Sequence, residues 1–272
     1  MDLHEILDVN EYQIITPNKF FTISEFQREN QLVLPSGSRN FDEILGGGFH
    51  SGKKYLIYGA NKTGKTQLCH QLCIQAYKNL IKPSNEKNSK FIVYFDTENT
   101  FRPERIEELV SPTEFKLNNI LKSILVSKIM SNSALLLALK DSESIFAKNY
   151  GSILFIDSIN NFFRSDLGDK NISFNKAIET FLNILRMLDN LTSKFNLFTI
   201  VTAQITSSFS KQAPFREIPM ANQFLNHFFS EYIYLTISDK GKYYTHLVNS
   251  FKMSEKKLPY MITKNGIQDY RI

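Results

Sequence analysis

From Gly37 onward, short apolar runs alternate with segments in which apolar residues recur at helical spacing. The apolar runs predict strands over residues 54–58, 91–95, 123–126, 152–156 and 197–202. The periodic segments predict helices over residues 65–79, 135–146 and 174–195. In the last of these, Ile178, Leu182 and Leu185 repeat at helical intervals, so one stripe of that helix is expected to face a sheet. This alternation predicts an α/β fold in which helices flank a mostly parallel, twisted sheet.

The last quarter of the chain has a different pattern. Segments 232–237 and 243–248 flank the turn Ser238-Asp-Lys-Gly-Lys242, and Lys264-Asn-Gly266 marks a second turn. We therefore expect a C-terminal extension of antiparallel hairpins after the parallel core. The polar stretch 82–90 is predicted to be a solvated surface insertion.

Two parts of the chain differ in texture. Residues 1–36 contain Pro17 and Pro35 and have an acidic balance, which predicts an N-terminal arm or linker. Residues 37–272 are predicted to form the α/β core. Near the first residues there is no basic region followed by an apolar run, so no secretory signal is predicted.

The composition fits a folded protein. Of the 272 residues, 42% are hydrophobic and 22% are charged, which supplies a sizeable core and excludes wholesale disorder. No stretch approaches the roughly 18 apolar residues of a spanning helix, so we expect a soluble, intracellular chain without a membrane partner. The cysteines, Cys69 and Cys73, lie four residues apart on a predicted helix and are expected to be reduced core thiols.

One motif carries specific chemistry. The segment Gly59-Ala-Asn-Lys-Thr-Gly-Lys65-Thr66 fits the pattern G-x-x-x-x-G-K-[ST] between a predicted strand and a predicted helix. Glycines let such a loop curl so that backbone N–H groups point at a phosphate, Lys65 adds a positive charge, and the Thr66 hydroxyl is suited to Mg²⁺. We predict ATP and Mg²⁺ as cofactors. The predicted ATP-binding residues of this segment are Gly59, Ala60, Asn61, Lys62, Thr63, Gly64, Lys65, Thr66 and Gln67.

Polar residues follow three of the other predicted strands. Asp157 follows a buried strand, as in a Walker B motif, and is predicted to reach the Mg²⁺ shell together with Thr66. Glu98 is the candidate base that orients an attacking water, with Lys65 as a second catalytic residue. Gln204 is predicted to sense the γ-phosphate by a hydrogen bond and to pass the signal to the loop that follows.

Three segments together resemble the RecA-type recombinases, most closely the archaeal RadA branch and its eukaryotic counterparts. They are Gly37–Gly48, Gly59–His70 and the diagnostic Asp96-Thr-Glu-Asn-Thr-Phe-Arg-Pro-Glu-Arg105. The resemblance runs from about Phe20 to the C-terminus. It implies a RecA-like ATPase core, with Glu98 as the catalytic glutamate, Arg105 packed on the adenine and Gln204 at the root of a DNA-binding loop.

The resemblance also implies single-stranded DNA as a partner. The family's two DNA-binding loops would fall at residues 164–176 and 205–222, and His227 keeps the position of the family's loop-coupling histidine. Basic side chains in these loops would contact the DNA backbone. The candidates are Arg164, Lys170, Lys176, Lys211 and Arg216.

Several positions depart from the family pattern. Only about 19 residues precede the matched region, so the family's N-terminal DNA-binding domain is expected to be absent. In the segment resembling the polymerisation motif Phe-x-x-Ala, Phe20 is kept as the subunit contact, but Ile23 replaces the small residue. The second loop closes with Met220-Ala-Asn222 where the family has Gly-Gly, and Ala203 replaces an asparagine. Asn249-Ser250-Phe251 replaces the family's Asp-Ser-Pro, which caps the neighbour's ATP.

Three functions remain open at this point. The chain is either a DNA-stimulated ATPase that assembles on single strands and pairs homologous DNA, or a recombinase paralogue that binds ATP and assists a partner recombinase. A third reading is another ATPase of the RecA fold, such as a KaiC-like regulator or a hexameric helicase. The partner is thus a second copy or a related recombinase subunit, in the nucleus of a eukaryote or the cytoplasm of an archaeon.

The charge distribution bears on this choice. The net charge of +5 combines an acidic first 50 residues with a basic remainder of 29 Lys/Arg against 19 Asp/Glu. The predicted DNA loops hold little of this excess, since residues 164–176 carry three basic and two acidic side chains. The charge therefore favours a nucleotide site and keeps the paralogue interpretation open.

Overall fold

The computed structural model describes residues 32–81, 91–110, 115–148, 152–207, 217–238, 241–250 and 253–270. The following sequence predictions lie outside these residues: the contacts of Phe20 and Ile23, the insertion 82–90, the DNA contacts of Lys211 and Arg216, and the change at Phe251.

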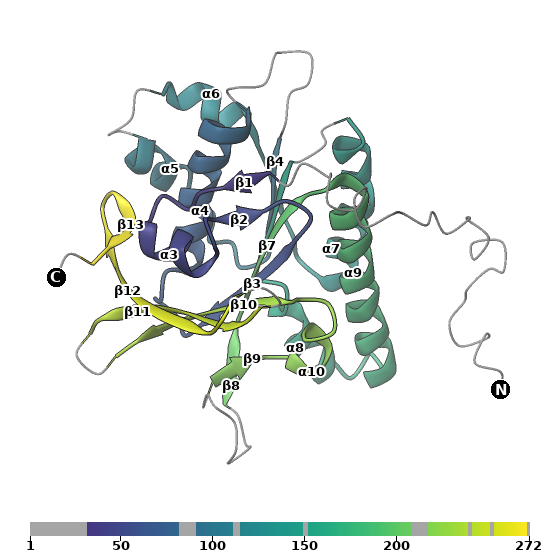
Figure 1. Ribbon diagram of the computed structural model, residues 1–272. Coiled ribbons are helices and arrows are strands. Elements are labelled where there is room, and N and C mark those ends of the chain that lie inside the picture. Colours follow the sequence, from purple (N-terminus) through teal and green to yellow (C-terminus); the bar gives the residue numbers. More distant parts are fainter. Residues whose placement is uncertain are drawn as a thin grey trace, which may run out of the picture. The chain divides into compact units, whose positions relative to one another are not determined.

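A nine-stranded sheet runs through the described part of the chain (Figure 1). Neighbouring strands from β10 to β5 are parallel, whereas β10, β11, β12 and β13 pair antiparallel. In spatial order the strands are β13 (Gly266–Asp269), β12 (Lys256–Thr263), β11 (Tyr243–Asn249), β10 (Glu231–Ile237), β3 (Lys54–Gly59), β7 (Phe198–Ala203), β6 (Ile153–Asp157), β4 (Ile92–Asp96) and β5 (Ile124–Lys128).

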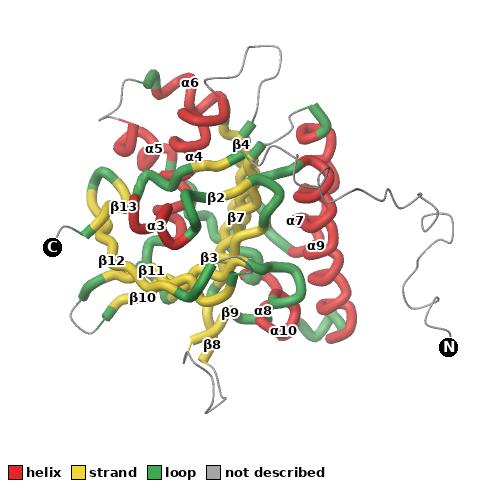
Figure 2. The backbone as a smooth tube through the Cα atoms, viewed as in Figure 1, coloured by secondary structure: helices red, strands yellow, loops and turns green. Residues whose placement is uncertain are grey.

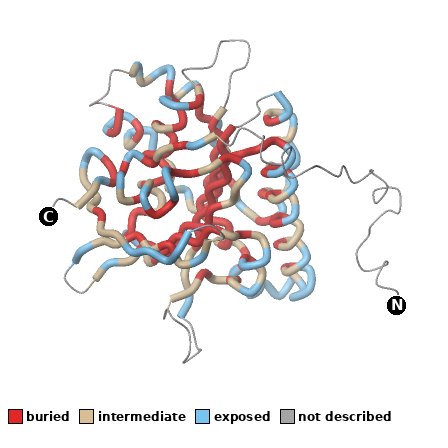
Figure 3. Tube along the Cα trace, in the orientation of Figure 1, coloured by how far each residue is buried: buried red, intermediate tan, exposed pale blue. Residues whose placement is uncertain are grey.

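Helices cover both faces of this sheet, and each face has its own apolar core (Figures 1 and 2). One core contains residues of α3 (Arg39–Ile44), α4 (Lys65–Ala76), α5 (Pro103–Val110) and α6 (Leu117–Lys122). The other contains residues of α7 (Asn132–Phe146), α8 (Asn161–Gly168), α9 (Phe174–Phe195) and α10 (Asn222–Leu225). Figure 3 shows the strands between them as the most buried part of the chain, as parallel sheets require.

Two short strand pairs lie outside the main sheet. β1 (Val33–Leu34) pairs antiparallel with β2 (Phe49–His50). β8 (Ile205–Ser207) pairs antiparallel with β9 (Glu217–Pro219), and this pair encloses residues 208–216 in sequence. Sequence periodicity does not reveal strands this short, because two or three residues carry no alternation.

The fold prediction is confirmed, with small differences at element ends. The helix predicted over 65–79 is α-helical only to Ala76, and the π-helical turn η2 (Tyr77–Ile81) follows, with Tyr77 and Leu80 buried. α7 begins at Asn132, three residues earlier than predicted, because the Ser131 hydroxyl accepts the Ala134 N–H and caps the helix. α9 spans the predicted residues.

The register of the sheet brings the carboxyl ends of four strands to one edge. Asp96 lies beside Asp157 on paired parallel strands, and Tyr58 lies beside Ala203. The carboxyl ends of β3, β4, β6 and β7 therefore meet, and that edge is where α/β folds place their ligands. Among the described residues, no helix is long and apolar enough to cross a membrane. Cys69 and Cys73 are buried free thiols, as predicted, and burial raises the pKa of both.

Candidate functional site

The loop from Gly59 to Thr66 connects β3 to α4 at this edge. Gly59 has a φ of 156°, and a side chain there would place its Cβ 2.2 Å from the Leu235 carbonyl oxygen on β10. Gly64 has a φ of 95°, a left-handed conformation, and caps α4 without a side chain. The first-turn N–H groups of α4 have no partners within the helix, so this end of the helix offers donors to an anion.

Lys65 bends back over this loop. Its Nζ donates to the carbonyl oxygens of Gly59, at 2.8 Å, and Ala60, at 3.0 Å. Burial lowers the pKa of Lys65, while the carboxylates of Glu98 and Asp157 oppose that shift. The ammonium group thus lies beside the donors of the loop and in the field of two carboxylates, where a phosphate would exchange for the two carbonyl contacts.

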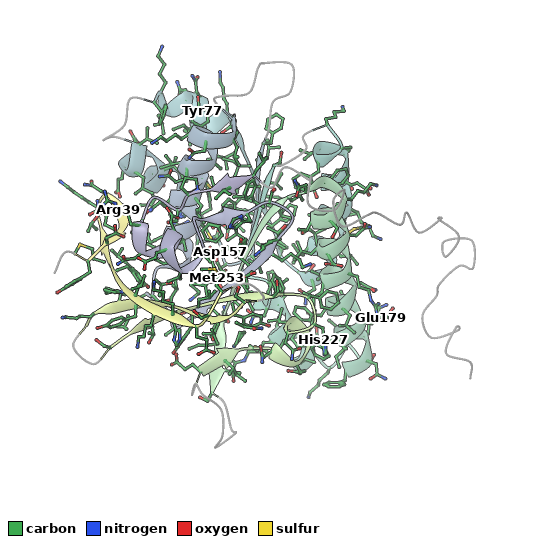
Figure 4. The ribbon with its side chains drawn as sticks, in the orientation of Figure 1. Arg39, Tyr77, Asp157, Glu179, His227 and Met253 are labelled. Carbon is green, nitrogen blue, oxygen red and sulfur yellow. The ribbon has the colours of Figure 1, made fainter. Side chains whose placement is uncertain are left out.

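Asp157 is the buried acid of the site and is 1% exposed (Figure 4). Its Oδ2 accepts hydrogen bonds from Thr66 Oγ1 at 2.7 Å and from the Tyr94 hydroxyl at 2.9 Å, and its Oδ1 accepts one from the Thr202 hydroxyl. Burial raises the pKa of Asp157, while the hydroxyls of Thr202, Thr66 and Tyr94 act in the opposite direction. These hydroxyl donors hold the orientation of the buried carboxyl.

The Thr66 and Asp157 oxygens are a fitting donor set for Mg²⁺. They lie side by side, and oxygen is the ligand type that this ion prefers. Among the described residues, no group of three His, Cys, Asp or Glu side chains could hold a metal. Mg²⁺ is commonly held by one or two protein ligands together with substrate phosphates, so the pair fits a nucleotide-bound Mg²⁺ rather than an all-protein metal centre.

Glu98 and Gln204 meet above the ends of β4 and β7. Gln204 Nε2 donates to Glu98 Oε1 at 2.9 Å, and Ser158 Oγ donates to the same oxygen at 2.6 Å. The strand ends thus bring together the candidate base and the candidate sensor. Sequence reasoning anticipated both residues but not their direct contact or the part played by Ser158.

Arg105 lies where α4, α5 and the turn between β12 and β13 converge. Its guanidinium donates to Gln67 Oε1 at 2.6 Å, to Glu108 Oε2 at 2.6 Å, and to the carbonyls of Thr263 and Lys264 at 2.9 and 2.8 Å. These bonds fix the guanidinium edge beside the helix that follows the phosphate loop. Its packing on an adenine stays a prediction.

The described candidates for DNA contact are exposed. Arg164 lies on α8, Lys170 follows that helix, and Lys176 lies in the first turn of α9, where its Nζ is 3.1 Å from Glu179 Oε2. His227 is exposed just after α10 (Figure 4). Phe163 of α8 contacts Phe224 of α10, and Asn160 at the start of α8 bonds to Gln204 just before β8, so the two predicted DNA segments begin near each other (Figure 1).

Two adjacent asparagines at this edge were missed by sequence reasoning. Asn160 is 0% exposed, and its side-chain amide bonds to the backbone of Gln204 and Met220. Asn161 bonds to the Thr97 carbonyl and the Gln204 side chain. Their place just after the buried strand that ends in Asp157 was a usable signal, since polar residues at that edge tend to be functional.

The family model for Rad51 matches residues 27–270. The chain belongs to the Rad51 family. It is 30% identical to the DNA repair protein RAD51 of Mycosarcoma maydis over 197 residues, 71% of this chain and 56% of that protein. It is 26% identical to the DNA repair protein Rad51 homolog of Drosophila melanogaster over 272 residues, 97% of this chain and 78% of the relative. It is 27% identical to the human meiotic recombination protein DMC1/LIM15 homolog, over 94% of this chain and 76% of that protein.

Two departures of this Rad51-family chain from the expected family pattern lie at the site edge. Ala203 is buried at the end of β7, directly before Gln204. Ala221 has a φ of 67°, a left-handed conformation that glycine adopts freely and alanine does not. The chain thus has a backbone shape suited to glycine in the segment 220–222, where the resemblance implies Gly-Gly.

Proposed function

We propose that this Rad51-family chain is an ATP-dependent DNA recombination and repair protein that binds single-stranded DNA and hydrolyses ATP between subunits. The observation that carries the proposal is the convergence of five polar residues on one sheet edge. Hydrogen bonds join Thr66 to Asp157 and Gln204 to Glu98, and Lys65 lies in the field of both carboxylates. The names of the relatives, DNA repair and meiotic recombination proteins, support the biological process.

Each residue has a distinct task in this proposal. Lys65 and the N-terminus of α4 hold the phosphates, and Thr66 with Asp157 holds Mg²⁺, which neutralises phosphate charge when bound. Glu98 accepts a hydrogen bond from the attacking water and orients it. When ATP is bound, the Gln204 amide leaves Glu98 and contacts the γ-phosphate. This movement shifts the first residues of the segment 205–219.

The proposed assembly uses a second copy of this chain or a related recombinase subunit. Among the described residues β5 ends the sheet, and its Leu125 and Val126 are 37% and 41% exposed. Beside it lies a groove of about 440 Å³ whose lining includes Phe95 and Ile145. An edge strand next to an apolar groove suits an extended segment with a large apolar side chain, and we propose residues 20–23 of the neighbouring subunit as that segment.

The test combines ATPase assays with electron microscopy. We expect ATP hydrolysis to rise several-fold when a single-stranded oligonucleotide is added, and continuous filaments to form with ATP and DNA. A Val126→Lys variant should lose filaments but still bind ATP, because it charges the edge strand without touching the nucleotide site. Absence of DNA stimulation and of filaments in the wild type would overturn the recombinase proposal.

The second candidate is a recombinase paralogue that binds ATP and a partner with little strand exchange of its own. Three changes favour it, at Ile23, at residues 220–222 and at residues 249–251. They fall in the segments expected to serve polymerisation, DNA binding and the neighbouring subunit's ATP, whereas the residues expected to contact ATP within one chain are kept. ATP binding together with a complex formed only with a related recombinase would support this candidate. Either protein would work in the compartment that holds the DNA, the nucleus of a eukaryote or the cytoplasm of an archaeon.

A further inference from the structure

Asn160 occupies the N-cap position of α8 but does not cap that helix. An asparagine at this position ordinarily accepts an N–H from the first helical turn. Here the side chain turns toward β7 and β9 instead. It is 0% exposed, so each of its polar atoms needs a partner within the protein.

The amide of Asn160 has partners on both sides of the 205–219 segment. Its Oδ1 accepts the Gln204 N–H at 2.9 Å, and its Nδ2 donates to the Gln204 and Met220 carbonyls, both at 3.0 Å. The Met220 N–H also donates to the Gln204 carbonyl at 2.9 Å. Gln204 directly precedes β8 and Met220 directly follows β9. Asn160 therefore bonds to both ends of this hairpin, which we call the hairpin root.

Asn161, the next residue, connects the same hairpin root to the candidate base Glu98. Asn161 Nδ2 donates to the Thr97 carbonyl at 2.7 Å, and its Oδ1 accepts from Gln204 Nε2 at 3.3 Å. Glu98 follows Thr97 and also accepts from Gln204 Nε2. Asn161 therefore joins the hairpin root to the segment that carries Glu98, while Asn160, three residues after Asp157, bonds to both ends of the root.

A third set of contacts joins this root to α8. Phe163, one turn beyond Asn160, stacks on Phe181 of α9 at 4.4 Å between ring centroids and lies edge-on to Phe224 of α10 at 5.9 Å. Phe224 follows the hairpin by a few residues. The residue just before the predicted first DNA segment and a residue just after the second thus share one aromatic cluster.

We propose that Asn160 is a positioning residue that couples the nucleotide site to the β8–β9 hairpin of the predicted DNA-binding segment 205–222. Its amide makes Gln204 and Met220 move as one unit, so a displacement of Gln204 by bound nucleotide reaches both strands of the hairpin. Without the amide, Gln204 and Met220 are joined only by the Met220 N–H bond to the Gln204 carbonyl and by the β8–β9 pairing, so less of the displacement reaches β9. The inference rests on the proposed function, because it concerns the coupling of ATP to single-stranded DNA.

The coupling between ATP binding and DNA binding can be measured as a ratio of two dissociation constants, and it is distinct from the affinity for either ligand alone. A ligand that shifts a two-state element changes the affinity for the second ligand, and the effect is reciprocal. We define the ratio as the Kd for a fluorescein-labelled oligo(dT) without nucleotide divided by the Kd with a nonhydrolysable ATP analogue and Mg²⁺. For the wild type we expect about tenfold, within the usual range of such couplings.

The test variant is Asn160→Ala, and its matched control is Gln71→Ala. Gln71 is also a buried amide with three bonds to backbone, to Ser36 O at 2.9 Å and to Ile267 O and N at 3.1 and 2.6 Å. Gln71→Ala removes the same chemistry on the other face of the sheet. We expect Asn160→Ala to bring the ratio below about threefold with ATP affinity retained, and Gln71→Ala to keep the wild-type ratio.

Folding is checked by circular dichroism melts. If Asn160→Ala does not fold, Asn160→Ser takes its place, since its hydroxyl is too short to bridge both carbonyls. Hydrogen exchange should also rise at residues 205–207 and 217–219 in the variant but not in Gln71→Ala. A wild-type ratio in the Asn160 variant, an equal loss in both variants, or a ratio of one in the wild type overturns the inference. A wild type that binds neither ligand overturns the proposed function itself.

Discussion

Gln204 and Ser158 donate hydrogen bonds to the same carboxylate oxygen of Glu98, at 2.9 and 2.6 Å. Two donors on one oxygen hold the Glu98 carboxylate in a single orientation. The backbone N–H and carbonyl of Gln204 also bond to the side-chain amide of Asn160. The candidate base, the candidate sensor and the hairpin root therefore form one connected network. We therefore expect changes at Glu98 to affect ATP hydrolysis, whereas changes at Lys65 should affect ATP binding.

Replacing Glu98 by glutamine should separate ATP binding from hydrolysis. Glutamine has nearly the same shape, but it cannot accept a proton or orient water as a carboxylate does. We expect ATP binding to persist and turnover to fall by at least about 100-fold, the usual size of a lost general base. Single-turnover hydrolysis of labelled ATP, with DNA present, measures the effect.

The control for that variant is Glu107→Gln, which removes an exposed carboxylate from α5 outside the segment 96–105. Its turnover should stay within about twofold of the wild type, because surface charges away from a site have small effects. Normal turnover in Glu98→Gln would show that another group orients the water.

Replacing Lys65 by alanine should abolish nucleotide binding. The change removes the ammonium group that lies near Glu98 and Asp157, so phosphates would enter a site with two uncompensated carboxylates. We expect the Kd for ATP to rise at least about 100-fold, corresponding to about 3 kcal/mol. Titration calorimetry measures it. Lys122→Ala, an exposed change in α6, should leave the affinity unaltered, and an unaltered Lys65→Ala would remove the phosphate loop from the proposal.

Local patterns were enough to predict the sheet and the phosphate loop. The strand ending at Gly59 and the helix beginning at Lys65 each have their own periodicity, and the motif between them fixes the backbone shape. The convergence of Asp157 and Glu98 followed from a topological rule, because parallel neighbours end at the same edge. These features depend on residues near one another in sequence or on strand order.

The remaining contacts depend on the tertiary structure. Arg105 donates to the carbonyls of Thr263 and Lys264, about 160 residues further along the chain, and no motif marks a backbone acceptor. Asn160 stands at the N-cap position of α8 without capping that helix, and only the packed structure shows that its amide bonds to the hairpin root. The short β8 and β9 likewise exist through pairing rather than pattern.

The stability of the fold should depend on pH through His70. This side chain is 1% exposed; its Nε2 accepts the Arg102 N–H at 3.0 Å, and its Nδ1 lies 2.7 Å from the Thr66 carbonyl oxygen. Burial lowers the pKa of His70 below its usual 6.5, opposed by the Thr66 bond. The folded state therefore prefers the neutral ring. That contribution is complete above pH 6.5 and is lost as the pH falls below 6.5 toward the folded pKa.

A His70→Gln variant isolates this effect. We expect it to be less stable than the wild type by about 1–3 kcal/mol at pH 7.5, since buried hydrogen bonds are lost. The difference should shrink at pH 5.5, because only the wild type loses the neutral-ring contribution. Urea denaturation at both pH values measures it. A difference that stays constant or grows on acidification would contradict the assignment of a lowered pKa.

The left-handed backbone at Ala221 gives the last prediction. Ala221 has φ 67° and ψ 25° and is 7% exposed, so its replacement by glycine relieves about 1–2 kcal/mol of backbone strain. That gain offsets the lost methyl burial of about 0.8 kcal/mol and the greater entropy of glycine in the unfolded chain. Ala221→Gly should therefore lie within about 1 kcal/mol of the wild type in unfolding free energy.

Ala177→Gly is the matched comparison, because Ala177 is 1% exposed but lies within helix α9, where alanine is unstrained. Its replacement loses the methyl group and adds the helix penalty of glycine, about 1 kcal/mol, with no strain to relieve. We expect Ala177→Gly to be the less stable of the two variants by about 1–2 kcal/mol in urea denaturation. Equal losses would mean that Ala221 stores no strain and that the hairpin root is relaxed at this position.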